Sequence, residues 1–262
     1  MFKKYLLSAA CLLIFLVAHS TTQAQQFNVL LFTKTDGFHH KSINEGVTAI
    51  REMAEKHHFS LDWHEDAKVF NDKNLKQYDV IFFLLTTGDI LSGEQQGAME
   101  RFIQSGKGFV GVHSASDTEY DWDWYTKMVG RTFHIHPVIQ TAELEVLDRT
   151  FPGLERMPDN FWWTDEFYEF GTERIDSLNY ILSVDGETFE TYAKWGEGKS
   201  EKESREMDFR PMAWYHQYAG GRAFYTALGH VPATYHDRLF LEHIYGGLFW
   251  AATGKGLKNS KD

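Results

Sequence analysis

The sequence is poor in cysteine and in positive charge, and each shortage excludes a class of protein. Its one cysteine in 262 residues is Cys11, in the amino-terminal apolar segment. A mature chain without that segment has no disulfide, no thiolate zinc site and no cysteine nucleophile. Lys and Arg number 26 against 37 Asp and Glu, for a formal net charge of -11. Nucleic acids and anionic membranes attract surfaces rich in lysine and arginine, so we expect neither as a partner.

The amino-terminal end has the pattern of a secretory signal peptide. Lys3 and Lys4 precede an apolar run over residues 6–18, and small residues follow before the end of the segment at Ala24. The run is too short to span a bilayer comfortably, and no later apolar run approaches the length of about 18 residues that a span needs. We therefore predict cleavage after Ala24 and a periplasmic or secreted protein with no membrane contact after cleavage.

Short apolar strands and amphipathic helices alternate in the first half of the chain. The expected strands share an apolar run bounded by turn residues, and lie at residues 27–32, 61–63, 80–85 and 109–112. Capping boxes at Ser42 and Ser92 predict the starts of two helices. Apolar strands separated by helices indicate a parallel sheet covered on both faces. The predicted fold class is therefore α/β, a three-layer sandwich with a mostly parallel sheet.

The second half is less regular. Its expected strands lie at residues 138–147, 180–184, 212–218 and 223–228. The last two are joined by a hairpin turn at Gly220 and Gly221, a final helix begins near Asp237, and the hydrophilic residues 196–205 are expected to form a solvated surface loop. The chain should consist of a signal peptide over residues 1–24, a single domain over residues 25–254 and a polar tail over residues 255–262.

Histidines follow several of the predicted strands. In doubly wound sheets ligands bind at the carboxyl ends of the strands, where His39, His113 and His230 are expected. Residues 111–115 have the shape of a nucleophile elbow, but its central residue is His113. An imidazole in that position can be a general base or a metal ligand, and Asp117 could orient it. Each histidine taken singly is equally compatible with a structural role.

Two further segments carry candidate side chains. His134 and His136 are two residues apart, a spacing that points both imidazoles to one side of an extended segment and occurs in metal sites and in solvated pairs alike. Glu166 follows a pair of tryptophans, where a carboxylate can bind hydroxyls, ligate a metal or act in acid/base chemistry. The glycine pattern of residues 106–111 enters a strand rather than a helix, and no Walker motif occurs, so we expect no nucleotide cofactor.

Taken together, the chain resembles the trehalose-utilisation (ThuA-like) family. The segments that carry the resemblance are residues 29–33, 37–40, 111–117, 125–130, 133–137, 165–168, 211–214, 221–230 and 247–251. The resemblance covers nearly all of the mature chain and implies the flavodoxin-like fold of the class I glutamine amidotransferases. Those relatives use a cysteine at the elbow and a downstream histidine. Here the elbow holds His113, which excludes glutaminase activity, and His230 resembles the downstream histidine.

The resemblance also implies a carbohydrate role, with trehalose, related disaccharides or 3-keto-glycosides as small-molecule partners. Our leading hypothesis is an exported enzyme, a lyase or a hydrolase, that cleaves such sugars by acid/base or metal-assisted chemistry. The alternative is a non-catalytic sugar-binding or accessory domain on a scaffold that lacks the cysteine nucleophile. A third hypothesis is an exported hydrolase of another ester or amide that uses metal-activated water.

The predicted site is centred on His113. The expected ligands of a divalent ion such as zinc are His39, His113, His136 and His230. The expected catalytic side chains are His113, His230, Asp117 and Glu166. No apolar stripe in the sequence predicts an oligomeric state.

Overall fold

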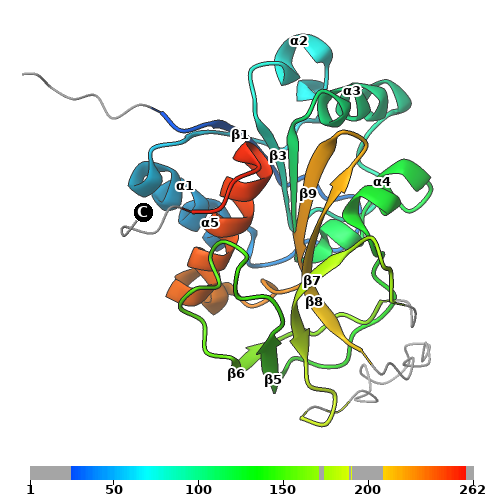
Figure 1. Cartoon of the computed structure of the whole chain (residues 1–262). Helices are drawn as coiled ribbons and strands as arrows, with labels where there is room; N and C mark the ends of the chain where they lie inside the picture. Colours follow the sequence, from blue (N-terminus) through cyan, green and yellow to red (C-terminus); the bar gives the residue numbers. More distant parts are fainter. Residues whose placement is uncertain (1–24, 171–173, 189, 191–208, 258–262) are drawn as a thin grey trace, which may run out of the picture.

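The computed structural model of this chain describes residues 25–170, 174–188, 190 and 209–257 (Figure 1). Three sequence predictions fall wholly or partly outside these residues. They are the signal peptide over residues 1–24, the surface loop over residues 196–205 and the last part of the polar tail, residues 258–262.

The described residues form one sheet of nine strands in the order β2-β1-β3-β4-β9-β8-β7-β5-β6. The strands are β1 (Asn28–Phe32), β2 (Ser60–His64), β3 (Val80–Leu84), β4 (Gly108–Val112), β5 (Gln140–Val146), β6 (Asn160–Asp165), β7 (Asn179–Val184), β8 (Pro211–Tyr218) and β9 (Gly221–Thr226). The neighbours from β2 to β9 are parallel, and the neighbours from β9 to β6 are antiparallel. We call these two parts the parallel half and the antiparallel half.

The prediction of a mostly parallel sheet is wrong, because the sheet is mixed. β8 and β9 are joined by a tight turn in which Ala219 and Gly220 both have positive φ, of 48° and 92°, and a turn this short can join only antiparallel strands. Exposed residues alternate with half-buried or buried ones along β6, which is typical of an antiparallel strand with one solvated face. The apolar runs that predicted a parallel sheet are confirmed in β3 and β4, where every residue is buried.

Helices cover both faces of the parallel half (Figure 1). The helices are α1 (Ile43–His57), α2 (Asp72–Leu75), α3 (Gly93–Gln104), α4 (Asp123–Val129) and α5 (Arg238–Thr253), with shorter 3₁₀ turns η1 (Ala67–Val69), η2 (His113–Ser116) and η3 (Pro232–His236). α1 and α5 lie against one face, and α3 and α4 lie against the other. α5 approaches β4 so closely that a Cβ at Gly108 would lie 2.3 Å from the Ala251 carbonyl oxygen. A side chain at position 108 would therefore push the helix away from the sheet.

The two predicted helix starts differ in their chemistry. At Ser92 the capping box is confirmed, since the Gln95 side chain accepts a hydrogen bond from the Ser92 backbone N–H at 2.8 Å. At Ser42 the box does not form, because the residue itself has helical backbone angles and its side chain caps nothing. The Ser42 hydroxyl instead donates to the Gly229 carbonyl oxygen at 3.4 Å. It therefore connects the start of α1 to the loop after β9.

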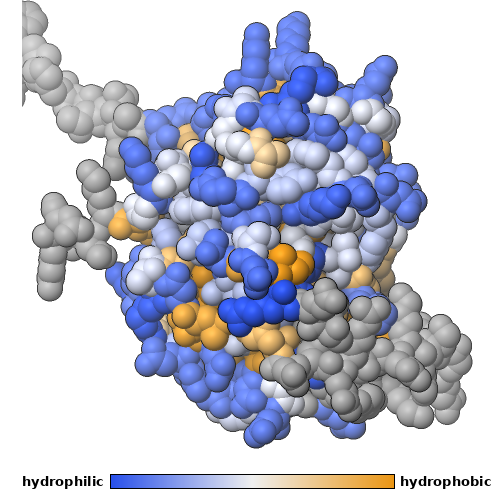
Figure 2. All heavy atoms as spheres, turned by 45° about the vertical axis from the view of Figure 1, so that its right-hand side comes forward, coloured by the Kyte–Doolittle hydropathy of each residue, from blue (hydrophilic) through white to orange (hydrophobic). Residues whose placement is uncertain are grey.

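The surface is largely hydrophilic on the face drawn in Figure 2, and its apolar side chains gather in small areas of the lower half. The large apolar side chains are concentrated inside, where β1, β3 and β4 pack between the helices. Within the described residues, no helix combines the length and the apolarity that crossing a bilayer requires.

Candidate active site and metal centre

The chain makes a strained turn at the end of β4. After Val112 the backbone enters η2 through His113, whose φ is 52°. A left-handed backbone is uncommon for a residue other than glycine, and such strain concentrates at functional sites. The turn is stabilised from outside, because the Tyr225 hydroxyl donates to the His113 carbonyl oxygen at 2.7 Å. The turn predicted after this strand is thus present, but an elbow of this kind is expected to expose its central side chain, and His113 is buried.

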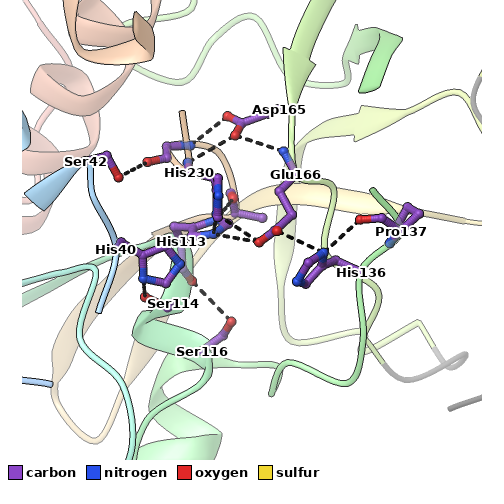
Figure 3. Close-up of polar contacts among 12 residues, drawn as sticks. His40, Ser42, His113, Ser114, Ser116, His136, Pro137, Asp165, Glu166 and His230 are labelled. Carbon is purple, nitrogen blue, oxygen red and sulfur yellow. Dashed lines mark hydrogen bonds and ion pairs between the residues drawn. The ribbon is translucent and has the colours of Figure 1, made fainter. Parts of the chain in front are cut away.

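Four side chains from distant segments meet at this turn (Figure 3). His40 precedes α1, His113 follows β4, Glu166 follows β6 and His230 follows β9. One potential ligand atom from each lies within 4.8 Å of the others. We call these four residues the His/Glu cluster. His40, His113 and Glu166 are buried, and the His230 side chain is 19% exposed, so the cluster meets solvent on the His230 side.

Three atoms of the cluster form a tight triangle. Glu166 Oε2 lies 3.3 Å from His113 Nε2 and 3.0 Å from His230 Nδ1, and the two nitrogens are 3.2 Å apart. The tautomer of His113 follows from its other nitrogen, which lies 2.7 Å from the Ala227 carbonyl oxygen. A carbonyl only accepts, so Nδ1 donates and, in the neutral ring, Nε2 presents its lone pair to the triangle. A lone pair facing a carboxylate needs a cation or a proton between them.

The charges in the cluster follow from burial and from contact with Glu166. Burial would raise the pKa of Glu166, but its contacts with His113, His136 and His230 outweigh that effect and hold the pKa well below its usual range. Burial lowers the pKa of His40 to about 2, helped by the charges of His113 and His230. Burial also acts on His230, but the hydrogen bond to Glu166 raises its pKa overall. At neutral pH, Glu166 is therefore ionised and His40 is neutral.

The donor set fits a divalent metal ion. Neutral imidazoles and carboxylates bind zinc with bond lengths of about 2.0 to 2.2 Å, which places two ligands of a tetrahedral ion roughly 3.3 Å apart. The separations in the triangle of His113, Glu166 and His230 are 3.0 to 3.3 Å. His40 adds a fourth donor that burial keeps unprotonated. Imidazole and carboxylate donors also suit iron, nickel and cobalt, so the residues alone do not select one metal.

His136 contacts the cluster through Glu166. His136 Nδ1 lies 3.0 Å from Glu166 Oε1 and 2.8 Å from the Pro137 carbonyl oxygen, and both of these atoms can only accept. The two carboxylate oxygens therefore have different tasks, since Oε1 meets His136 and Oε2 meets His113 and His230 (Figure 3). A partner of this kind orients a ligand and tunes its basicity. The sequence predicted His136 as a metal ligand, and the structure places it behind Glu166 instead.

Asp165 holds the two halves of the site together. Its fully buried carboxylate accepts hydrogen bonds from the backbone N–H groups of Glu166, Gly229 and His230 at 3.0, 2.8 and 3.0 Å. The Trp163 indole N–H lies 3.2 Å from the same carboxylate. Three strands separate β6 from β9 in the sheet, yet these bonds join the end of β6 to the loop after β9. Asp165 thus places Glu166 beside His230.

The Asp165 contact also requires a particular backbone at Gly229. This residue has a φ of 119°, and a Cβ there would lie 2.9 Å from the Tyr235 hydroxyl oxygen. Only glycine adopts this conformation without strain. In the sequence, Asp165 and Glu166 both follow the tryptophan pair as candidate carboxylates. The adjacent pair Asp165 and Glu166 contains no signal that tells which carboxylate enters the cluster.

Two predicted site residues lie outside the cluster. His39 is exposed, with Nδ1 3.1 Å from the Thr35 hydroxyl oxygen, and the neighbouring His40 points inward. The sequence predicted His39 as a ligand, but His40 is the member of the pair that lies in the cluster. The direction of each side chain depends on how the loop after β1 turns. Asp117 lies at the end of η2, where its Oδ1 accepts a hydrogen bond from the Tyr120 hydroxyl at 2.7 Å. It is not one of the four cluster residues.

Several known proteins are similar to this chain. The family model described as ThuA, trehalose utilisation, matches residues 28–251. A ThuA-like protein from Bacteroides uniformis ATCC 8492 is similar with a TM-score of 0.70 and 19% identity, over 87% of this chain and 92% of that one. A ThuA-like protein from Parabacteroides merdae ATCC 43184 gives 0.68 and 18%, over 90% and 93%. At these identities the likeness shows the fold.

Part of a larger enzyme has a similar fold. The β-galactosidase from Bacillus circulans sp. alkalophilus gives a TM-score of 0.53 at 13% identity, over 88% of this chain but 32% of that one. No curated protein matches the chain.

Proposed function

This chain belongs to the ThuA family, and on that premise we propose that it is a metal-dependent enzyme that cleaves 3-keto-glycosides, including oxidised disaccharides. The observation that carries the proposal is the triangle of His113 Nε2, Glu166 Oε2 and His230 Nδ1, with separations of 3.0 to 3.3 Å. A divalent ion held there would polarise a sugar carbonyl as a Lewis acid. The keto group is what distinguishes these sugars from ordinary glycosides.

The chain's own residues prepare this site in three ways. The Ala227 carbonyl fixes the tautomer of His113, so that Nε2 faces the triangle. Burial keeps His40 neutral, which leaves a lone pair for a ligand bond. His136 and Asp165 orient Glu166 and His230 before any ligand arrives. Pre-oriented groups in a water-poor site interact more strongly with developing charge than mobile groups in water do.

The reaction class follows from the chemistry of a keto-sugar. A carbonyl next to a C–H bond acidifies that bond, so loss of its proton gives an enolate that expels the glycosidic oxygen one carbon further away. The electrons of the broken C–H bond form the new double bond, and the base that removes the proton from carbon passes it to the departing alkoxide. Stabilising the enolate oxygen is the demanding step, and a cation held by the His/Glu cluster is suited to it.

Metal analysis combined with turnover tests the proposal. We expect purified protein to hold one divalent ion per chain, to cleave trehalose oxidised at C3 and to leave trehalose itself intact. Prolonged chelation should abolish turnover, and the restored ion should recover it. A protein that binds the sugar without turning it over, with or without metal, would support the non-catalytic binding domain instead. Turnover that survives complete metal removal would support acid/base cleavage without an ion.

The proposal includes export and a carbohydrate partner. The signal-like segment before Gln25 supports export. Amino-terminal sequencing of protein from the native host should show cleavage after Ala24, and an intact or lipid-modified amino terminus would contradict it.

A further inference from the structure

The loops that follow β1, β3 and β4 are bonded to one another beside the cluster. Thr35 pairs with Thr87, and Gly88 pairs with Thr118, in bridges that extend the parallel ladder past the ends of the strands. The Gly88 backbone N–H also donates to the Asp117 carbonyl oxygen at 2.9 Å. We call these three linked loops the rim. Because each loop is hydrogen-bonded to the next, the backbone of the rim is held in place.

Phe38 stands on the rim with its ring in solvent. The side chain is 63% exposed, although burial of a phenylalanine usually stabilises a fold. Its backbone is held in place, because the Thr87 hydroxyl donates to the Phe38 carbonyl oxygen at 3.0 Å and accepts from the Gly37 N–H at 3.2 Å. The loop is therefore anchored through its backbone while the Phe38 ring stays in solvent, where a ligand can contact it.

The Phe38 ring also touches the cluster. Its centroid lies 4.8 Å from that of the His40 imidazole, with the two planes at 82°. His40 in turn meets His113 and His230 edge to face, with centroids 5.0 and 5.1 Å apart. A molecule bound at the cluster therefore has an aromatic surface directly beside it.

A second exposed aromatic on the rim is held by hydrogen bonds of its own side chain. Tyr120 is 46% exposed, and its hydroxyl oxygen lies 2.7 Å from Asp117 Oδ1 and 2.9 Å from the Phe133 carbonyl oxygen. Trp162 is as exposed as Phe38 but lies on β6, the outermost strand of the antiparallel half. Strand alternation places its side chain on the face opposite to that of Asp165. Among these exposed aromatics, only Phe38 contacts a cluster residue.

We propose that Phe38 is the specificity-determining platform for the sugar and that the substrate is a pyranoside, which lays its apolar C–H face on this ring. The inference rests on the proposed function and adds the ring form of the substrate to it. A pyranose has hydroxyls around its edge and C–H bonds on its faces, and an aromatic π-system attracts such C–H groups. The platform would hold the ring while its carbonyl oxygen faces the cluster. Phe38 acts by binding and takes no part in proton transfer.

Kinetics of Phe38→Ala and Phe38→Trp with C3-oxidised trehalose test the platform. We expect Phe38→Ala to raise KM about tenfold and to leave kcat within about twofold, because the ring binds substrate and transition state alike. Phe38→Trp should keep KM near that of the wild type. Trp162→Ala, an equally exposed aromatic away from the rim, is the matched control and should change neither constant.

Metal affinity and binding of an unreactive sugar separate this inference from the proposed function. Phe38→Ala should bind its ion as the wild type does and should weaken methyl glucoside binding, measured by calorimetry, by a similar factor. If the ion is tight and KM does not change in Phe38→Ala, the platform is wrong while the function stands. If Phe38→Ala loses metal affinity, the ring only packs against His40, and the platform is again wrong. A wild type that does not turn over keto-sugars, but binds methyl glucoside through Phe38, overturns the function alone.

Discussion

The parallel and antiparallel halves of the sheet contribute different chemistry to the same site. The parallel half supplies His40, His113 and His230, all of which follow or lie near the carboxyl ends of its strands. The antiparallel half supplies the charge, through Glu166 at the end of β6. Imidazoles alone would form a weak neutral cluster, and the carboxylate alone would be a buried charge without a partner. The site therefore exists only where the two halves meet.

Removal of the Glu166 charge, which the antiparallel half supplies to the cluster, should have the largest effect. Glu166→Gln keeps the shape of the side chain but replaces the carboxylate that His113 and His230 contact. We expect metal affinity to fall by more than the roughly 10- to 100-fold that loss of a supporting residue causes, and turnover to become undetectable. Competition with a chromophoric chelator measures the affinity.

The matched control for this variant is Glu143→Gln, on β5 of the same half, which should bind metal and turn over substrate as the wild type does. Retention of tight metal by Glu166→Gln would show that the carboxylate is not a ligand, and the proposed donor set would be wrong.

Asp165→Asn should weaken the hydrogen bonds that connect the end of β6 to the loop after β9, without removing a metal ligand. The amide offers one acceptor oxygen where the carboxylate receives N–H groups from Glu166, Gly229 and His230. Its NH₂ group would face donors that it cannot satisfy. We expect metal affinity to fall roughly 10- to 100-fold and the free energy of unfolding to fall by about 2 kcal/mol.

Two measurements distinguish positioning by Asp165 from a general loss of stability. Cobalt absorption spectra of the loaded Asp165→Asn variant should differ from those of the wild type at full occupancy, because the ligand geometry changes. Urea unfolding gives the stability. A variant that is less stable but has the wild-type cobalt spectrum and affinity would show that Asp165 only stabilises the fold.

How much the sequence could predict also differs between the halves. The apolar runs of the parallel half predicted its strands, and position at a strand end predicted His113 and His230. β6 was not predicted as a strand, because its sequence has no continuous apolar run and only its last residue is fully buried. It also chose His39 over His40, since neighbouring residues differ only in the direction that the loop gives them. Tertiary contacts, which no local pattern contains, decide both cases.

The smallest expected effect is on the free energy of unfolding, and it concerns two buried histidines, one in each half. In the parallel half His243 lies on α5, fully buried, and within the described residues neither of its ring nitrogens has a hydrogen-bond partner. Burial lowers the pKa of His243 to about 3. In the antiparallel half His216 is buried as well, but its Nε2 lies 2.7 Å from the Met128 carbonyl oxygen and donates to it. Burial also lowers the pKa of His216. The pair separates the effect of burial from that of a missing partner.

The pH dependence of stability follows from the sign of the His243 shift. Its folded pKa of about 3 lies below the unfolded value of 6.5. Below pH 6.5, therefore, His243 binds a proton in the unfolded chain but stays neutral in the folded chain until the pH approaches 3. The His243 contribution is therefore fully present above pH 6.5 and is lost progressively as the pH falls toward 3. At pH 5 the loss is about 2 kcal/mol. His243→Leu, which cannot bind the proton, should flatten the profile between pH 7 and 5 by this amount.

His216→Leu completes the comparison and fixes what each outcome means. At pH 7 His243→Leu should stabilise the protein by about 1 kcal/mol, because it removes a buried polar ring without a partner. His216→Leu should destabilise it by about 1 to 3 kcal/mol, because the buried Met128 carbonyl oxygen loses its donor. Urea unfolding at pH 7 and pH 5 gives all four values. If His243→Leu destabilised the protein at pH 7, its imidazole would have a favourable partner in solution, and the assignment of a buried ring without a partner would be wrong.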